Sequence, residues 1–529
     1  MYFFQGTMGM RRKDPKPLAR FAAAVLAIFF LLGFVACATL PQDYPRTESY
    51  AMAPSEEGEL ARVAKKISEK FGEEKSGFLT IDQNSDALDW RLMLADQAQH
   101  SIDAQYFIWH GDESGMLLLL RLLQAADRGV RVRLLVDDLL LGGAEKSLAA
   151  LDTHPDLEVR VFNPWKGRGG ALGKGFEFLG KMKKLNARMH NKVMVADNRF
   201  AIVGGRNIGN EYFGLSKKYN FRDTDVLCVG PVAAELSKSF DLYWNSESVY
   251  PGEAFSTSKT LDKYLKKRRK VWQRKLAKSE DLLGSFSLYP QDWSEELNLL
   301  PDIMSGGLAK VVYDKPLVGT DMPPVQMFEG LDELFEDMRE EVFIITPYLI
   351  PHDGDLNEIQ GAIDQGIRVK ILTNSLGATD SPIVHSAFRR YRRPIIETGT
   401  ELYELRHDAE IQVLYDTPPV RAKFLGLHSK VIIVDYDRVY VGSSNFDPRS
   451  VYLNTEVGLL IDDPVLADEL ARLFYRDLAP ENSWRVRLDE KDELIWESSD
   501  GILRKEPART GWQRFQVGFY SLLPIEDQL

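Results

Sequence analysis

The sequence predicts an α/β protein in which one lobe occurs twice. The segment AADRGVRVRLL at residues 125–135 returns as AIDQGIRVKIL at 362–372, an offset of 237 residues. Each copy is typical of a helix end, a capping glycine and a buried strand. A second pair, HNKVMVADNRFAIVGGRNI at 190–208 and HSKVIIVDYDRVYVGSSNF at 428–446, has an offset of 238 and seven identities in nineteen positions. Two offsets that agree within one residue indicate a duplicated lobe.

The duplication divides the rest of the chain into an anchor and connecting segments. Residues 251–308 interrupt the pattern with the basic run KKRRK and a later Gly-Gly pair, which is the composition of a linker or insertion. The aromatic, apolar end at 511–529 is expected either to complete the second lobe as a strand and loop or to contact a membrane edge. The expected divisions are a basic n-region with a possible tag scar at 1–20, an anchor at 21–40, a lead-in at 41–80, the first lobe at 81–250, the linker at 251–308 and the second lobe at 309–529.

The N-terminus predicts attachment to a membrane. Five basic residues between positions 11 and 20 precede the uncharged stretch 21–40, FAAAVLAIFFLLGFVACATL. Up to Cys37 this stretch fits a lipoprotein signal with a degenerate lipobox, and up to Leu40 it is long enough to cross a bilayer once. Both alternatives predict a membrane-anchored protein of the bacterial cell envelope, with the bulk of the chain periplasmic or extracytoplasmic.

Charge and cysteine content limit the kinds of partner and fold. The 529 residues include 66 Lys+Arg and 78 Asp+Glu, a net charge of −12, whereas a general nucleic-acid binder needs a basic face that displaces counterions from phosphate. No nucleic acid is therefore expected as a partner. The cysteines are Cys37 and Cys228, too few for a disulfide scaffold or a cysteine zinc site. Cys228, in the apolar run VLCV, is expected to be a small buried side chain.

Each copy of the repeat carries the pattern H-x-K-x4-D, then a small turn and an asparagine. The residues are His190, Lys192, Asp197 and Asn207 in the first copy, and His428, Lys430, Asp435 and Asn445 in the second. In a strand, a histidine and a lysine two residues apart face the same side. Two imidazoles, two ammonium groups and two amides are therefore available to one site.

That set of groups fits the chemistry of phosphodiesters. Lysine and asparagine side chains can hold the non-bridging phosphate oxygens. One imidazole can attack phosphorus, and the other can transfer protons to and from the alcohols. Zinc-binding motifs, a P-loop and a G-x-S-x-G elbow are absent from the sequence, so no metal or cofactor is expected.

The paired motifs resemble the signature of the phospholipase D superfamily, and the resemblance extends from about residue 80 onward. The continuation of the second motif, GSSNFDPRS at 442–450 and NTEV at 454–457, is similar to bacterial cardiolipin synthases of the C type. The segments AQYFIW at 104–109 and LTNSL at 372–376 are similar as well. The resemblance implies two lobes, each a mixed β-sheet flanked by helices, related by pseudo-twofold symmetry with one active site at their interface.

The same resemblance implies roles for individual residues. His190 would be the nucleophile that forms a phosphohistidine, and His428 the general acid and base. Lys192, Lys430, Asn207 and Asn445 would bind the substrate phosphate, while Asp197 and Asp435 would tie each motif into its lobe. His385 resembles a position that binds the lipid headgroup, although a structural histidine is an equal alternative.

Each motif histidine also needs a carboxylate that fixes its tautomer. In the second lobe the candidate is Glu456, and the first lobe offers Asp223 and Asp225. Aligning DTDV with NTEV selects Asp225. Counting back from the following proline selects Asp223, because Pro231 and Pro464 both lie eight residues beyond Asp223 and Glu456. Asp223 is the preferred prediction.

These patterns predict a cardiolipin synthase that moves a phosphatidyl group between phospholipids at a membrane surface. Phosphatidylglycerol would be the acceptor, with phosphatidylethanolamine or a second phosphatidylglycerol as donor, and a small accessory protein is a partner left open. The main alternative is a phospholipase D that forms phosphatidic acid by using water as acceptor. A secreted phosphodiesterase or nuclease and a non-catalytic lipid-binding protein are weaker alternatives. The basic cluster at 181–184 is a further candidate for attracting anionic headgroups.

Overall fold

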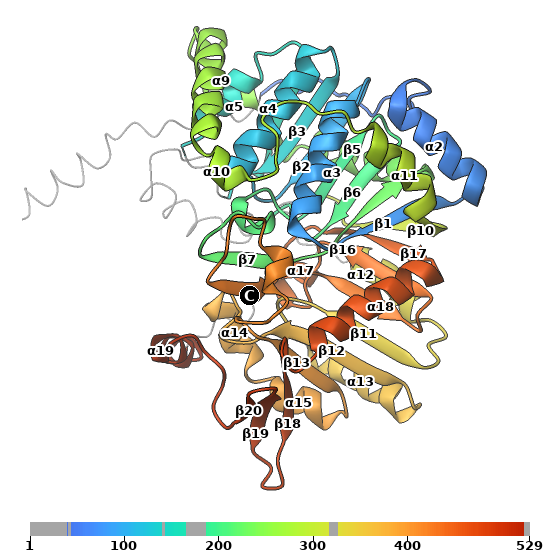
Figure 1. The fold of residues 1–529 in the computed structure, drawn as a ribbon, viewed down its shortest axis with the longest axis vertical. Helices are drawn as coiled ribbons and strands as arrows, with labels where there is room; N and C mark the ends of the chain where they lie inside the picture. Colours follow the sequence, from blue (N-terminus) through green and yellow to red (C-terminus); the bar gives the residue numbers. More distant parts are fainter. Residues whose placement is uncertain (1–39, 41–43, 140–142, 166–186, 317–325, 523–529) are drawn as a thin grey trace, which may run out of the picture. The chain divides into compact units, whose positions relative to one another are not determined.

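The fold is described from a computed structural model, which describes residues 40, 44–139, 143–165, 187–316 and 326–522 (Figure 1). The chain divides into two compact units, residues 1–42 with 165–182, and residues 43–164 with 183–529. All elements named below lie in the second unit. The predicted anchor, apart from Leu40, and the basic cluster at 181–184 fall outside the described residues. Across the residues that are described, no helix combines the length and apolarity needed to cross a bilayer.

A mixed sheet runs through both halves of the chain, and two further strands, β7 and β14, pair with each other apart from it. The strands of the first half are β1 (Ser76–Ile81), β2 (Ser101–Tyr106), β3 (Arg131–Asp137), β4 (Leu157–Phe162), β5 (Lys192–Ala196), β6 (Phe200–Gly204), β7 (Tyr219–Arg222), β8 (Asp225–Val229) and β9 (Val249–Pro251). Those of the second half are β10 (Ser305–Tyr313), β11 (Glu341–Ile345), β12 (Arg368–Asn374), β13 (Glu401–Leu405), β14 (Phe424–Leu427), β15 (Val431–Val434), β16 (Arg438–Gly442), β17 (Val457–Asp462), β18 (Ser483–Leu488), β19 (Leu494–Ser498) and β20 (Gly501–Leu503).

The order of the strands is the same in the two halves. The first lobe runs β9-β4-β3-β2-β5-β6-β8-β1, and the second runs β18-β13-β12-β11-β15-β16-β17-β10. In each lobe three neighbouring strands are parallel, β2 to β4 and β11 to β13, and the others pair antiparallel. β1 pairs antiparallel with β10 and joins the two lobes into one sheet. The repetition read from the sequence is thus visible in the strand order.

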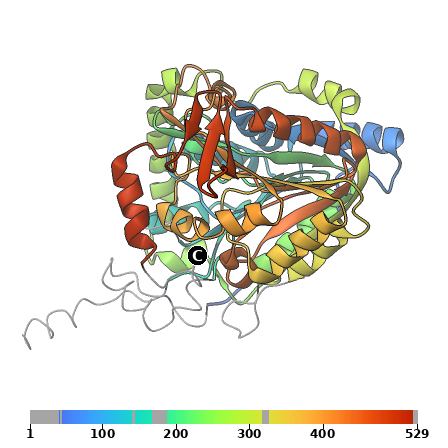
Figure 2. The same ribbon diagram turned by 90° about the horizontal axis from the view of Figure 1, so that it is seen from below.

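Helices cover the sheet on both faces (Figures 1 and 2). The first half contains α2 (Gly58–Phe71), α3 (Asn84–Gln97), α4 (Glu113–Asp127), α5 (Glu145–Leu151), the 3-10 turns η1 (Asn210–Tyr212) and η2 (Gly252–Phe255), α8 (Pro231–Trp244), α9 (Leu261–Lys278), α10 (Glu280–Leu283) and α11 (Ser294–Ile303). The second contains α12 (Gln326–Phe335), α13 (Asp353–Asp364), α14 (Pro382–Phe388), α15 (Arg392–Glu397), α16 (Gln412–Tyr415), α17 (Pro448–Tyr452), α18 (Pro464–Leu478) and α19 (Gly511–Tyr520).

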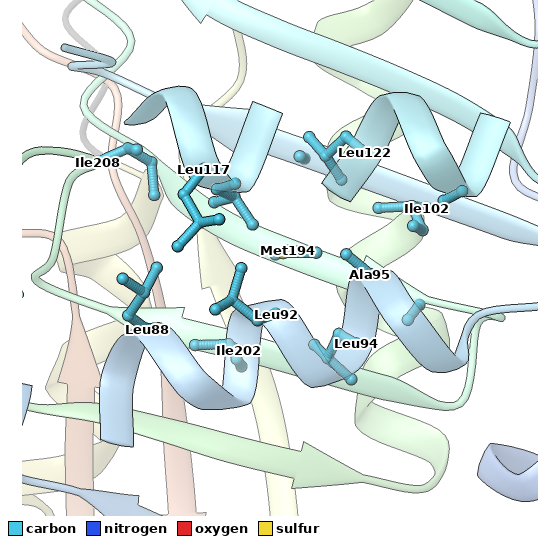
Figure 3. Packing of buried hydrophobic residues seen from close by; sticks show 14 of the residues in the cluster. Leu88, Leu92, Leu94, Ala95, Ile102, Leu117, Leu122, Met194, Ile202 and Ile208 are labelled. Carbon is cyan, nitrogen blue, oxygen red and sulfur yellow. The ribbon is translucent and has the colours of Figure 1, made fainter. Parts of the chain in front are cut away.

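Apolar cores hold these layers together. In the first lobe α3 and α4 pack on one face of the sheet through residues such as Leu92, Leu117 and Met194 (Figure 3). A second core contains side chains of both lobes, including those of α8 and α18. It also includes Cys228, which is buried as the sequence predicts. The third core lies under α12 and α13 in the second lobe. Because one core is shared, burial of apolar surface holds the lobes together.

Local sequence explains the repeated elements. Gly129 and Gly366 have φ of 89° and 90°, and each follows the helix end that precedes a buried strand, α4 before β3 and α13 before β12. A side chain with a Cβ is strained in that backbone conformation, so glycine stops the helix there. The hairpins β5-β6 and β15-β16 each turn through two residues of positive φ, beginning with Asp197 and Asp435. Such turns match the twist of the strands that they join.

Some segments that the sequence predicts as lead-in or linker form helices and strands. The expected lead-in at 41–80 includes α2 and most of β1, which pairs with β8 inside the first lobe. The expected linker at 251–308 forms helices α9 to α11, and α9 packs against α4 and α5 through buried Leu265, Trp272 and Leu276. The apolar end forms helix α19 rather than a strand. Its aromatic residues recur at helical spacing, and this periodicity was not used in the sequence prediction.

Candidate active site

The two motifs meet because each motif loop pairs with a loop of the other lobe. The backbone N–H of His190 donates to the carbonyl of Thr455 at 2.9 Å, and that of Thr455 donates to the carbonyl of Arg188 at 2.9 Å. On the other side β7 runs parallel to β14, and the N–H of His428 donates to the carbonyl of Arg222 at 2.8 Å. These contacts hold both motifs in one site between the lobes.

Each motif histidine contacts a carboxylate of the other lobe, an arrangement that we call the exchange of carboxylates. Nδ1 of His190, in the first lobe, lies 2.9 Å from Oε2 of Glu456 in the second. Nδ1 of His428, in the second lobe, lies 2.6 Å from Oδ2 of Asp223 in the first. The sequence places each candidate carboxylate in the same lobe as its histidine, and the structure corrects that pairing. With Nδ1 bonded to a carboxylate, Nε2 of each imidazole is left for chemistry.

Asp225, the other candidate of the first lobe, has different partners. Its Oδ2 lies 2.8 Å from Nη2 of Arg91 and 3.4 Å from Nη1 of Arg206, all of them buried. Its Oδ1 accepts the backbone N–H of Arg206 at 3.2 Å. Asp225 therefore anchors the turn that follows β6, and Asp223 is the carboxylate that contacts a motif histidine.

The small residue of each motif turn is fitted to its carboxylate. A Cβ at Gly205 would lie 2.2 Å from Oδ1 of Asp223, so only glycine leaves room for this carboxylate. The equivalent residue in the second lobe is Ser443, whose hydroxyl donates to Oε2 of Glu456 at 2.5 Å. The backbone N–H of Glu456 donates to Asp314 at 2.9 Å. Ser443 and Asp314 position Glu456, and the sequence analysis did not assign either role.

The motif lysines and asparagines are all buried. Nζ of Lys192 donates to the carbonyl of His190, and Nζ of Lys430 donates to that of His428. The amide of Asn207 is engaged within the first lobe, since it accepts from the N–H of Ile108 at 3.1 Å and donates to the hydroxyl of Tyr212 at 3.0 Å. Oδ1 of Asn445 is buried and accepts no hydrogen bond from the described residues. The two asparagines, equivalent in sequence, thus differ in how open they are to a ligand.

The motif aspartates support the backbone of their own lobe. The carboxylate of Asp197 accepts the N–H groups of Gln99, His100 and Ser101 at 2.8–3.1 Å. That of Asp435 accepts those of residues 339, 340 and 341 at 2.8–3.0 Å. Both fix the loop that enters the first parallel strand, β2 or β11. This arrangement corresponds to the structural role that the family resemblance implies.

His385 lies in an ionic cluster of the second lobe. Its Nε2 is 2.8 Å from Oε1 of Glu506 and 2.9 Å from Nη2 of Arg392. Arg392 also pairs with Glu404 at 2.6 Å. His385 borders a narrow space of about 10 Å³ beside Tyr348 and Asn374, too small for a headgroup. Of the two alternatives for His385, these contacts favour the structural one.

Aromatic rings pack against both motif histidines. Phe107 lies edge-on to His190, with ring centroids 4.9 Å apart, and Tyr212 lies edge-on to His428 at 5.2 Å. These rings keep the imidazoles in place and exclude water from their faces. Phe107 occurs in the segment 104–109 that resembles the family, but a single sequence gives no signal that assigns Phe107 or Tyr212 to the site. Within the described ranges, no three His, Cys, Asp or Glu side chains are grouped as metal ligands.

Burial sets the charges of the site. Burial, and then the charges of Lys192 and Lys430, lower the pKa of His190 well below its usual value, and burial lowers that of His428 to about 4. Burial raises the pKa of Glu456 to about 7. Burial also acts to raise the pKa of Asp223, but the neighbouring His428 and Lys430 hold it below its usual range. The carboxylate beside His428 therefore stays charged at neutral pH, whereas the one beside His190 is protonated in part.

The lowered pKa values of the two motif lysines predict that kcat/KM falls at alkaline pH. Burial lowers the pKa of Lys192 to about 7 and that of Lys430 to about 8. As pH rises through this range the free enzyme loses the positive charges that attract a phosphate, so kcat/KM is expected to fall. Rates measured between about pH 6 and 9 check this. Lys192→Arg should move this fall to higher pH, because guanidinium keeps its proton. A kcat/KM that stays level or rises across this range contradicts the assignment.

The family model and two relatives that match this chain are all described as cardiolipin synthases. Residues 92–244 and 331–478 match the family model described as "Cardiolipin synthase, PLD-like domain". The chain is 34% identical over 468 residues to "Cardiolipin synthase C" of Escherichia coli K12, which covers 85% of this chain and 95% of that protein. It is 28% identical over 406 residues to "Cardiolipin synthase" of Staphylococcus aureus Mu50, covering 76% of this chain and 67% of that protein.

The fold resembles that of a phosphatidylserine synthase of known structure. The phosphatidylserine synthase of Haemophilus influenzae Rd KW20 superposes with a TM-score of 0.51 and 17% sequence identity. The likeness covers 78% of this chain and 91% of that chain. At this level of identity it concerns the arrangement of the large sheet and its helices.

Proposed function

Because the chain belongs to the cardiolipin synthase family of PLD-like proteins, we propose that its two-motif site moves a phosphatidyl group from one phospholipid to the hydroxyl of phosphatidylglycerol. The observation that carries this proposal is the exchange of carboxylates, His190 with Glu456 and His428 with Asp223. It gives one buried site two oriented imidazoles and two lysines, which is what a double displacement at phosphorus needs.

In the first displacement Nε2 of His190 attacks the phosphorus of the donor lipid. The P–N bond forms while the bond from phosphorus to the headgroup oxygen breaks, and Nε2–H of His428 protonates that oxygen. In the second displacement neutral His428 takes the proton of the phosphatidylglycerol hydroxyl. The hydroxyl oxygen bonds to phosphorus, the P–N bond breaks, and both histidines return to their starting states. Lys192 and Lys430 offset the charge that develops on the phosphate oxygens.

The charges of the two carboxylates support this division of roles. Asp223 remains ionised at neutral pH and stabilises an imidazolium at His428, as a general acid requires. Glu456, with a pKa of about 7, stabilises an imidazolium at His190 less, which favours the neutral form that attacks phosphorus. A bound phosphate adds negative charge beside both imidazoles and raises their pKa values, so His428 can carry a proton in the complex. We further propose that the repeated strand order reflects a pseudo-twofold axis between the lobes.

A product assay tests the transferase against the hydrolase. Incubation of the protein with labelled phosphatidylglycerol, alone or with phosphatidylethanolamine, is expected to yield cardiolipin together with glycerol or ethanolamine. Thin-layer chromatography of the lipid products and detection of the released alcohol identify both the reaction and the donor. Phosphatidic acid without cardiolipin would reject the synthase and leave a phospholipase D. The matched control is His190→Ala, which lacks the proposed nucleophile and should form neither product.

Helix α19 supports a further element of the proposal, contact with the membrane surface. Trp512, Phe515 and Phe519 are 63%, 62% and 54% exposed, at intervals of three and four residues on one helix face. Such an aromatic stripe suits the boundary between headgroups and acyl chains. A Phe515→Cys variant labelled with an environment-sensitive dye is expected to shift its emission to the blue on anionic vesicles. Tyr289→Cys, at a position 71% exposed in another segment, is the control, with the wild-type chain labelled in parallel. Equal responses at both positions would contradict the contact.

A further inference from the structure

The second lobe contains a cavity that the transfer chemistry leaves unused. Its volume is about 600 Å³, within the range of about 300–1,000 Å³ that small-molecule sites occupy. The cavity lies between the sheet and the helices α12 and α13. Its lining is largely apolar and includes Val342, Ile344, Val369 and Ile432 of the sheet, Leu331 of α12 and Ala362 of α13.

The cavity is continuous with the second motif. Lys430 and Asn445 line it, and the buried Oδ1 of Asn445 is the atom that lacks a partner among the described residues. The exposed residues Glu336, His352 and Glu358 line it as well. Because the motif residues and these exposed residues border the same cavity, it extends from Lys430 to the surface between α12 and α13. Its cationic group lies at the motif, and acidic groups border its opening.

The first lobe provides an internal comparison, because the equivalent space there is filled. Leu88, Leu92 and Leu117 pack between α3, α4 and the sheet (Figure 3). The offset of 237 residues aligns Leu117, Leu118 and Leu120 of α4 with Gly354, Asp355 and Asn357 of α13. All three leucines are buried, whereas Gly354 and Asn357 are exposed and Asp355 lines the cavity. The second copy therefore lacks the apolar side chains that these three leucines supply in the first.

We infer that this cavity binds one acyl chain of a phospholipid whose phosphate lies at Lys430, an inference that rests on the proposed function. His190 and His428 are only 7% and 6% exposed, so a lipid must leave the bilayer plane in part before its phosphate reaches them. An apolar cavity that begins at the site keeps the displaced chain out of water. The carboxylates at the opening repel an anionic headgroup there, which orients the lipid with its phosphate toward the lysines.

The first test uses phosphatidylglycerols of increasing chain length, held below their micelle concentrations so that the chain starts in water. For the wild type, kcat/KM is expected to rise by up to about fourfold for each added methylene. Ala362→Phe reduces the cavity, and it should lower the ratio of long-chain to short-chain kcat/KM by at least about tenfold. Gln365→Phe, at the exposed end of the same helix, should keep the wild-type ratio. An unchanged ratio in Ala362→Phe overturns the inference.

The second test detects the chain directly and does not depend on turnover. Phosphatidylglycerol with a photoactivatable diazirine at the end of one acyl chain is expected to label α12, α13, β11 or β12 when irradiated with the full-length wild-type protein. Mass spectrometry of the peptides locates the label. Labelling confined to other segments, α19 included, overturns the acyl-chain site whatever the rates. If the label enters the cavity but no phosphatidyl group is transferred, the proposed function fails while the binding site stands.

Discussion

His190→Ala is expected to lower turnover by at least about 10⁴-fold and to abolish the covalent phosphatidyl-enzyme. The imidazole that forms the P–N bond is missing from this variant. The adjacent Lys192 is directed to the carbonyl of residue 190, and His428 is held by Asp223 for proton transfer. The measurement is rapid quenching with phosphate-labelled phosphatidylglycerol, followed by detection of acid-labile phosphoprotein. A His190→Ala enzyme that still acquires the label would overturn the assignment of the nucleophile.

His428→Ala separates bond formation from proton transfer. With phosphatidylglycerol as donor its turnover should fall by about 10²–10⁴-fold, because the departing alcohol is no longer protonated. With a phosphatidyl ester of p-nitrophenol, whose leaving group needs no proton, the covalent enzyme should still form and then accumulate. His154→Ala, in the loop that follows α5, is the matched control and should retain wild-type rates. Equal losses with both donors would argue against His428 as the general acid.

Replacement of Asp223 and of Asp225 by asparagine is expected to have different effects, one on catalysis and the other on stability. Asp223→Asn should lower kcat by about 10²–10⁴-fold with little change in Tm, because the amide cannot stabilise an imidazolium at His428. Asp225→Asn removes the buried carboxylate that pairs with Arg91 and Arg206, so it should destabilise the fold by about 3–5 kcal/mol. Steady-state kinetics and thermal unfolding of both variants separate these effects. The reverse result, with Asp225→Asn inactive but stable, would identify Asp225 as the carboxylate that assists His428.

Glu456→Gln provides the complementary measurement on the other histidine. It should slow formation of the covalent enzyme with either donor, since Glu456 orients His190 rather than the general acid. Asp223→Asn should slow this step only when the leaving group needs a proton. If the two variants show the same dependence on leaving group, the carboxylates are not divided between the histidines as proposed.

The duplicated lobe could be predicted because the repeat is local. A glycine that ends a helix, a buried strand and an H-x-K-x4-D hairpin each depend on residues close in sequence, so two copies at one offset imply two copies of the same substructure. The spacing to the following proline also selected Asp223, the carboxylate that lies against His428.

What the sequence could not supply is the set of contacts between distant segments. His190 and Glu456 are 266 residues apart, and His428 and Asp223 are 205 apart. A repeat tells which residues are equivalent in two lobes, but which loops meet depends on how the lobes pack. The cavity under α13 also depends on contacts between distant segments, because α12, α13, the sheet and the second motif all line it. Asn207 and Asn445 likewise have equal positions in the motif and different surroundings.

The exchanged carboxylates also bear on how the enzyme is made. During translation His190 is added to the chain long before Glu456. Because the two residues lie 266 positions apart, this histidine gains its acidic partner only after the segment between them and Glu456 have been synthesised. A chain that ends before residue 456 lacks the carboxylate that lies against Nδ1 of His190. Both histidine–carboxylate pairs therefore form only after the second lobe has been synthesised and has docked on the first.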